Sequence, residues 1–168
     1  MSGIIGGAGS KSGVIREGTN SPAWLVRPSS NQSIPNATHT KVSFQVAEVD
    51  THGAWDNSNM RWTVPGGKGG MYHVAGGLRF PYLDDQERIH ANWRIDGTAQ
   101  ARGSHFQWYA GPDNDDNLRF TFTAEFELNS TQYIELWVWH DEGAARNFDG
   151  GSSAVNTYTF MSGYRINI

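Results

Sequence analysis

The 168-residue sequence predicts an all-β domain built from two packed sheets. Short stretches in which apolar and polar residues alternate recur along the chain, and turns rich in glycine separate them. This pattern is typical of a sandwich of antiparallel strands. No stretch has the three-to-four-residue apolar spacing of an amphipathic helix. Twenty glycines and seven tryptophans, with only 18% charged residues, further indicate many turns and extensive aromatic packing.

Composition and charge exclude several classes of protein. The net charge of -4 provides no basic surface for nucleic acid. The absence of cysteine excludes disulfides and cysteine-ligated zinc. No apolar run approaches 18 residues, so we expect no membrane insertion. The opening MSGIIGGAGSKSG has neither the basic start nor the apolar core of a signal peptide, which predicts a protein made in the cytoplasm.

The first 22 residues are expected to form a Gly/Ser-rich arm, and residues 23–168 a single domain. Six glycines among residues 1–20 leave a segment that cannot form a core by itself. It is either a disordered tail or an arm that becomes ordered on a partner. The anchors of such an arm would be its two apolar pairs, Ile4 with Ile5 and Val14 with Ile15.

Strands are predicted in the first half of the domain at residues 23–27, 41–49, 60–64 and 70–80. Pro28 ends the first, and Pro35 makes residues 31–36 turn-like. The second strand alternates well, with Val42, Phe44 and Val46 facing inward. A flexible GGKGG turn precedes the strand at 70–80.

The second half continues the pattern with strands at 87–95, 105–110, 119–128, 133–140 and 157–168. The Asp96–Gly97 pair is a strong turn signal. The stretch RFTFTAEFEL at 119–128 is the cleanest strand, with an apolar inward face and threonine and glutamate outward. An acidic loop, residues 111–117, and a Gly/Ser-rich loop, residues 142–156, complete this half.

The strand Tyr133–His140 is apolar on both faces. Ile134, Leu136 and Val138 point one way and are expected to fill the sandwich. Tyr133, Trp137 and Trp139 point the other way. A soluble monomer does not usually expose such a patch, so something must cover it.

Four segments together resemble the tumour necrosis factor-like and complement globular-head jelly rolls. They are NQSIPNATHTKVSFQVAEVDTHGAWD, RWTVPGGKGGMYHVAGGLRF, AEFELNSTQYIELWVWH and TYTFMSGYRI. The resemblance spans residues 23–168 and implies a two-sheet jelly roll that forms a homotrimer about a threefold axis. It further implies that Tyr133, Trp137 and Trp139 face that axis, and we add His73 to this interface. The turn at 64–70 and the loop at 97–117 are longer than the family pattern.

The opening MSGIIGGAGSKSGVI resembles small structural proteins of tailed bacteriophages. This resemblance implies a virion protein.

Enzyme signatures are absent from the sequence. There is no GxSxG, P-loop or HExxH motif, and the six histidines lack the spacing of a metal cluster. We therefore expect no enzyme activity, metal or cofactor. Paired carboxylates such as Asp84 and Asp85 can serve glycoside hydrolysis, but adjacent carboxylates point apart, and a solvated turn is the simpler interpretation.

Two groups of residues are candidates for ligand binding. Asp113, Asp115 and Asp116 supply oxygen ligands that suit calcium, although without EF-hand spacing. Trp55 and Trp108 lie in or beside loops, where an aromatic ring can stack on a sugar or a protein partner. Trp93 alternates with core residues and is expected in the core.

These observations favour a non-enzymatic virion structural protein, a homotrimeric capsid decoration or cement protein. Its arm would bind the major capsid protein or another virion protein. No collagen-like or coiled-coil shaft suggests a long fibre. The alternative is a receptor-binding knob of a phage tail or head fibre, which would grip a host surface glycan with Trp55, Trp108 and the acidic loop. A jelly-roll glycosidase is a third hypothesis.

Overall fold

The computed structural model describes residues 21–80, 88–100, 106–109, 118–148, 150 and 158–166. In this part of the chain the regular structure is β-sheet, as predicted, and none of it is a helix long and apolar enough to cross a membrane. The strands are, in order, β1 (Ala23–Arg27), β2 (Gln32–Ile34), β3 (Thr40–Lys41), β4 (Val46–Asp50), β5 (Trp55–Asp56), β6 (Arg61–Thr63), β7 (Gly70–Phe80), β8 (Arg88–Ile95), β9 (Thr98–Ala99), β10 (Phe106–Tyr109), β11 (Leu118–Leu128), β12 (Tyr133–His140), β13 (Arg146–Phe148) and β14 (Phe160–Arg165).

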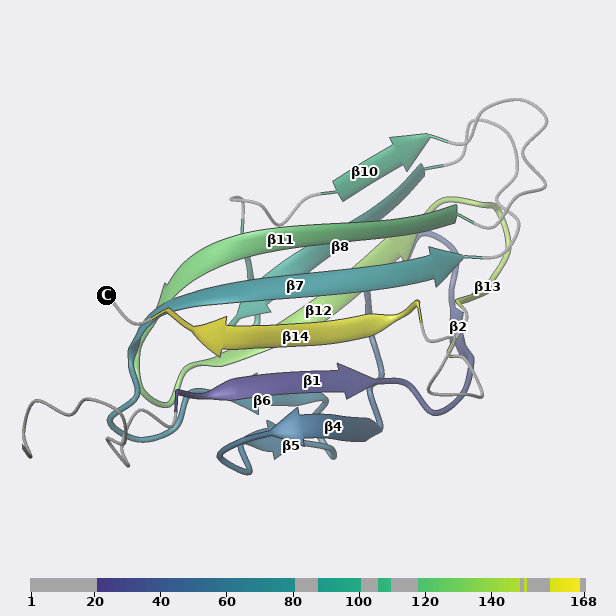
Figure 1. The fold of residues 1–168 in the computed structure, drawn as a ribbon. Helices are drawn as coiled ribbons and strands as arrows, with labels where there is room; N and C mark the ends of the chain where they lie inside the picture. The colour runs from purple at the N-terminus through teal and green to yellow at the C-terminus, as the bar shows by residue number, and fades with distance from the viewer. Residues whose placement is uncertain are drawn as a thin grey trace, which may run out of the picture.

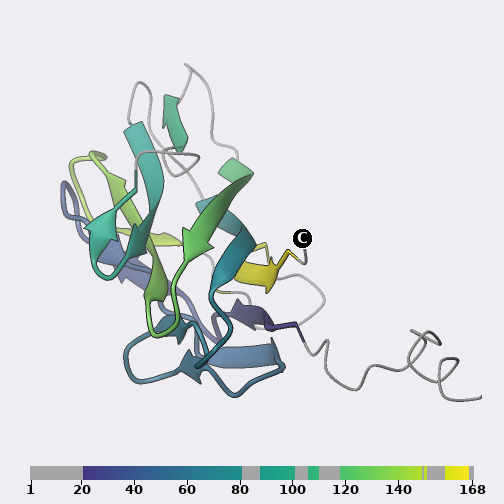
Figure 2. The same cartoon turned by 90° about the vertical axis from the view of Figure 1, so that its left-hand side faces the viewer.

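Two antiparallel sheets form the two layers of a sandwich (Figure 1). One has five strands in the order β11-β7-β14-β1-β4. The other has seven strands, with the path β10-β8-β12-β6-β5, β3 on β12 and β9 on β8. Figure 2 shows the layers after a quarter turn. The predicted two-sheet jelly roll is therefore confirmed, whereas the arm of residues 1–20 lies outside the described residues.

Residues 40–50 depart from the prediction, because they form two strands in different sheets. β3 pairs with β12, and β4 pairs with β1 in the other layer. The segment between them crosses the sandwich, and its Val42 and Phe44 side chains are fully buried. The alternating pattern correctly predicted the burial of Val42 and Phe44, whereas Val46 is only partly buried. Alternation does not reveal which sheet a strand joins. Residues 32–34 also form a strand, β2 on β13, which ends directly before Pro35.

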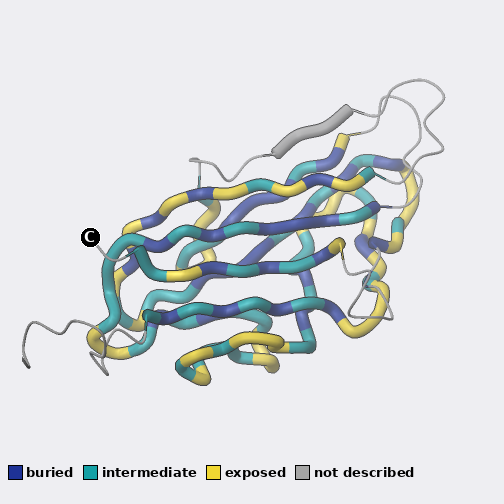
Figure 3. Tube along the Cα trace, in the orientation of Figure 1, coloured by how far each residue is buried: buried dark blue, intermediate teal, exposed yellow. Residues whose placement is uncertain are grey.

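The core is rich in aromatic rings. Trp24 and Trp62 stack with ring centroids 3.9 Å apart, and Trp93 is fully buried as expected. Gly163 makes room for this packing, since a Cβ atom there would lie 2.3 Å from the Trp24 ring. Along β11, buried and exposed residues alternate as predicted (Figure 3), although Phe122 is only partly buried.

Candidate functional site

The outward face of β12 is covered within a single chain. Ile134, Leu136 and Val138 fill the core, as predicted. The opposite side chains of Tyr133, Trp137 and Trp139 are half-buried rather than exposed. The cover comes largely from cations on neighbouring strands, which is an arrangement that the sequence did not reveal.

A cationic side chain lies over each of these three rings. Arg61 lies 4.3 Å from the Tyr133 centroid, Arg94 3.9 Å and Lys41 5.6 Å from Trp137, and Arg88 5.4 Å from Trp139. The strands that carry these cations, β6, β8 and β3, all pair with β12 in the seven-stranded sheet. Cation–π contacts of this kind stabilise each ring by about 0.5–2 kcal/mol, so this surface forms part of the folded domain's own packing.

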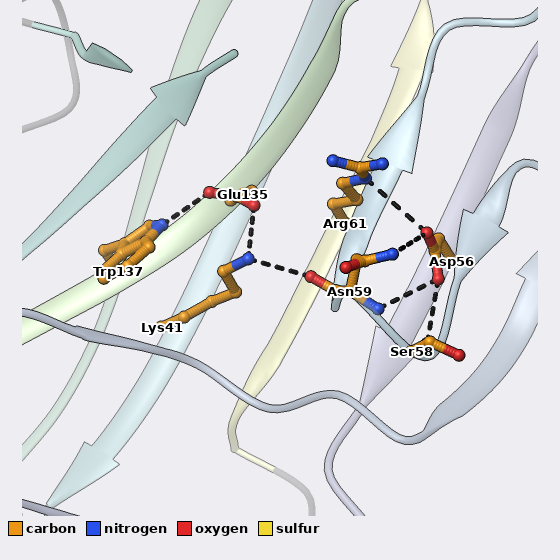
Figure 4. A network of polar contacts seen from close by, with 7 residues as sticks. All are labelled: Lys41, Asp56, Ser58, Asn59, Arg61, Glu135 and Trp137. Carbon is orange, nitrogen blue, oxygen red and sulfur yellow. Dashed lines mark hydrogen bonds and ion pairs between the residues drawn. The ribbon is translucent and has the colours of Figure 1, made fainter. Parts of the chain in front are cut away.

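Glu135 lies at the centre of this face (Figure 4). Its side chain is only 5% exposed, and Lys41 Nζ lies 2.5 Å from one carboxylate oxygen. The Trp137 indole N–H donates to the other oxygen at 2.8 Å. Lys41 also donates to the Asn59 carbonyl at 3.0 Å. Each carboxylate oxygen thus has a partner, and Glu135 links Lys41 and Trp137.

Asp56 orders the turn that leads into β6, on the right of Figure 4. Its carboxylate accepts the Asn59 side-chain amide at 2.7 Å and the backbone N–H groups of Ser58 and Asn59 at 3.0 Å. The hydrogen bonds from Asn59, chiefly the side-chain one, lower the pKa of Asp56. This turn places Arg61, whose guanidinium lies over Tyr133.

The histidines are distributed over separate environments. His90 lies 4.4 Å from the Trp139 ring, and His39 lies 6.1 Å from His90. His140 is fully buried, and its Nε2 atom faces the Ile34 carbonyl at 2.9 Å, so Nε2 carries the hydrogen. Across the described part of the chain, no three His, Cys, Asp or Glu side chains are grouped to hold a metal.

His73 lies on the other side of the molecule. It points outward from β7 in the five-stranded sheet, where Nδ1 is 2.9 Å from Glu125 Oε1 and the Tyr164 ring is 5.2 Å away. Tyr133, Trp137 and Trp139 point outward from the seven-stranded sheet. The four residues predicted at the trimer interface therefore do not share one face of the subunit, because strands from opposite layers direct their outward side chains in opposite directions. Their place at a trimer interface stays a prediction.

The outer face of the five-stranded sheet consists of cross-strand rows. The strand register places Tyr164, His73 and Glu125 in one row, Ser162, Ala75 and Thr123 in the next, and Phe160, Gly77 and Thr121 beyond them. Arg79 and Arg119 follow as direct neighbours. The exposed large apolar side chains of the described residues are Val49, Tyr158 and Tyr164, at 42%, 40% and 51%. They lie on this sheet or directly before its strand β14.

A shallow groove lies at the arginine end of this face. It has a volume of about 230 Å³ and is lined by Leu78, Arg119, Phe120, Thr121, Tyr158 and Phe160. Arg119 lies 3.9 Å and Arg79 5.4 Å from the centroid of the Tyr158 ring. Sequence reasoning missed this groove, because its residues come from β7, β11 and the start of β14 with the residues before it, and the fold alone brings these segments together.

Of the other candidate residues, only Trp55 has a described side chain. Trp55 lies on β5, half-buried, with its ring 6.2 Å from Phe44 and its indole N–H donating to Asn57 Oδ1 at 3.2 Å. Its ring therefore packs against the core. Trp108 lies on β10, but its side chain is outside the description. The remaining candidates also lie outside the described residues: Asp84, Asp85, Asp113, Asp115, Asp116, Ile4, Ile5, Val14 and Ile15.

Comparison with known proteins relates the chain to one bacterial protein and to two solved domains. No protein-family model matches it. The uncharacterized protein YqcC of Bacillus subtilis is 26% identical over 132 residues, which cover 76% of this chain and 36% of that protein. The chain thus spans about a third of this relative.

Among solved structures, the globular domain of zebrafish complement 1qA protein matches with a TM-score of 0.59 and 12% identity, over 87% of this chain and 98% of that one. Murine APRIL matches with a TM-score of 0.57 and 13% identity, over 87% and 99%. The sandwich therefore has the jelly-roll fold of the tumour necrosis factor-like and complement globular-head domains.

Proposed function

We propose that the protein is a non-enzymatic, homotrimeric head domain that decorates the surface of a virion. The observation that carries the self-assembly is the contrast between the two outer faces. The seven-stranded sheet covers its outward aromatic rings with its own cations. The five-stranded sheet leaves Tyr164 about half exposed beside a row of small, uncharged side chains.

The interface that we propose is centred on Ser162, Ala75 and Thr123. These side chains are short and uncharged, so a second copy can approach this part of the sheet closely. Tyr164 lies at the edge of this row and supplies a large amphipathic side chain, of the kind enriched at protein interfaces. The number of subunits, three, comes from the resemblance to tumour necrosis factor-like jelly rolls. Tyr133, Trp137 and Trp139 form the competing interface.

The non-enzymatic part of the proposal is supported by the state of the buried carboxylates. Glu135 is paired with Lys41, and Glu142, whose side chain is fully buried, is paired with Arg146. A glycosidase needs a protonated acid and an ionised partner facing the same sugar bond. Each buried glutamate is instead engaged by a cation of its own.

Two matched variants distinguish the proposed interface from the competing one. Tyr164→Asp places a charge beside the small-residue row and is expected to convert the trimer to monomer. Trp137→Asp places the same charge on the other sheet and is expected to leave the trimer intact. Light scattering coupled to size-exclusion chromatography gives both masses. A trimer lost only in Trp137→Asp would move the interface to β12, and a monomeric wild type would contradict self-assembly.

The virion role rests on the arm that the sequence predicts before the head. We propose that Ile4, Ile5, Val14 and Ile15 bind the major capsid protein or another virion protein after synthesis in the host cytoplasm. Deletion of residues 1–20 is expected to leave a folded trimer that no longer co-sediments with capsids lacking the protein. Retention of the truncated trimer on capsids would contradict the arm model.

The alternative function is a receptor-binding head that recognises a host glycan. The observation that favours it is the groove beside Arg119, rather than the predicted Trp55, whose ring packs against Phe44. A glycan array separates the two functions, because a decoration protein needs no glycan.

A further inference from the structure

The groove at the end of the five-stranded sheet exists because of a glycine. Gly77 lies directly opposite Phe160 on β14. A Cβ atom at Gly77 would lie 2.4 Å from the Phe160 ring and 2.7 Å from the Tyr158 carbonyl oxygen. The glycine therefore lets the Phe160 ring lie against the sheet surface. Thr121, which is paired with Gly77 on β11, lines the groove from the other strand.

The groove combines aromatic rings with one available cation. Arg119 is exposed, and its described contact is with the Tyr158 ring, 3.9 Å from the guanidinium carbon to the centroid. No carboxylate of the described residues pairs with it. A guanidinium that lies over a ring keeps the N–H donors in its own plane free, and these donors match the two oxygens of a carboxylate.

The size and lining of the groove restrict the ligand. Its volume of about 230 Å³ is below the roughly 300–1,000 Å³ of sites for drug-sized molecules, so it fits a single ring. Tyr158 and Phe160 offer aromatic surface, and the Thr121 hydroxyl can donate and accept hydrogen bonds. A pyranose ring has an apolar face for such rings and hydroxyls for such a threonine. Arg119 adds the requirement for an acidic group.

We propose that this groove binds one acidic sugar, a pyranose that carries a carboxylate. Sialic acid and uronic acids share this chemistry. The carboxylate pairs with Arg119, the sugar ring packs against Tyr158 and Phe160, and a sugar hydroxyl bonds to Thr121. The inference depends neither on the trimer nor on the virion role, since every lining residue comes from one chain.

The first test is ligand-observed NMR on the intact protein with three methyl glycosides: those of sialic acid, glucuronic acid and galactose. At least one acidic glycoside is expected to bind, with a Kd on the order of 1 mM because a single ring buries little surface. The neutral galactoside is expected to bind at least about tenfold more weakly, because it lacks the partner of Arg119. Comparison of the two acidic glycosides shows whether the groove prefers a sialic acid or a uronic acid.

Variants then assign the binding to the groove. Arg119→Gln is expected to weaken it at least about tenfold, and Tyr158→Leu to weaken it as well. Lys68→Gln is the control, since it removes one positive charge from the turn before β7 and is expected to leave the Kd unchanged. Arg119→Lys should restore only part of the affinity, because an ammonium cannot bind both carboxylate oxygens in the same fork.

The same samples separate this inference from the proposed assembly. Molecular mass and circular dichroism report whether a variant still folds and oligomerises, independently of the Kd. Absence of binding by either acidic glycoside at 20-fold the expected Kd, roughly 20 mM, would overturn the inference. So would binding that is equal for Arg119→Gln and wild type, or equal for acidic and neutral sugars. Selective capture of acidic peptides instead of sugars would reassign the groove to a protein partner.

Discussion

Asp56 illustrates how one partly buried carboxylate can hold an aromatic and cationic surface in place. Its hydrogen bonds from Asn59 and Ser58 close the turn that carries Arg61 to the Tyr133 ring. The same hydrogen bonds lower the pKa of Asp56. Because the folded-state pKa lies below the unfolded value, the ionised carboxylate stabilises the fold above the unfolded pKa, and this stabilisation is lost as pH falls through the folded pKa.

We therefore predict that Asp56→Asn lowers the Tm at pH 7 and that the difference from wild type shrinks below about pH 4. Thermal unfolding followed by circular dichroism from pH 7 to pH 3 measures both. Glu127→Gln is the control, because Glu127 is an exposed carboxylate on β11, and its Tm difference should stay small throughout. A Tm difference for Asp56→Asn that grows in acid would contradict the assigned role.

The Lys41–Glu135 ion pair leads to a second prediction at the level of single residues. Lys41→Met leaves the Glu135 carboxylate buried with only the Trp137 N–H as a partner. Losing one member of a buried pair costs about 3 kcal/mol in the free energy of unfolding. The double variant Lys41→Met with Glu135→Leu removes the uncompensated charge and should recover most of that loss. Urea unfolding at one fixed protein concentration measures the free energy of unfolding of each variant. Additive effects of the two substitutions would show that the two groups do not interact.

At the level of strands, close packing of β1 against β14 depends on Gly163. This residue is paired with Trp24, and a Cβ atom there would lie 2.3 Å from the Trp24 ring and 2.9 Å from the His73 carbonyl. Gly163→Ala is expected to lower the free energy of unfolding by about 1–3 kcal/mol through overpacking. Gly66→Ala is the matched control, since nothing lies within 4 Å of its Cβ position, and it should be nearly neutral. Equal effects of the two variants in urea unfolding would contradict this account.

The same strands show what the sequence can and cannot predict. The inward faces of β11 and β12 followed from alternation, because a period of two is a local property of an extended chain. The sheet to which a strand belongs depends on distant partners, so the split of residues 40–50 between two sheets was not predicted. The need for a cover over Trp137 was predicted, but the cover, Arg94 and Lys41, arises from strand register. The groove at Arg119 was missed for the same reason.

At the scale of the whole molecule, the charges that β7 and β11 present on the five-stranded face are separated along the strands. Glu125 and Glu127 lie towards one end of β11, and Arg119 lies at the other. The row between them, with Ala75 at its centre, is uncharged. Copies that pack with this row facing a common axis bury few charges. In the proposed assembly the glutamates and the arginines then lie on either side of the contact row.

This arrangement predicts that assembly and thermal stability are linked. If subunits bind through the face centred on Ala75, folding is coupled to association, and the wild-type Tm rises with protein concentration. Ala75→Arg introduces a charge into the central row, where three copies would bring three guanidinium groups together without counter-charges. Its Tm is expected to be lower and independent of concentration, while its circular dichroism spectrum stays that of a β-sandwich. Trp137→Asp should retain the concentration dependence. A wild-type Tm that is constant over a hundredfold range of concentration would mean that the folded unit is the monomer, and the exposed Tyr164 would then have to contact a different partner.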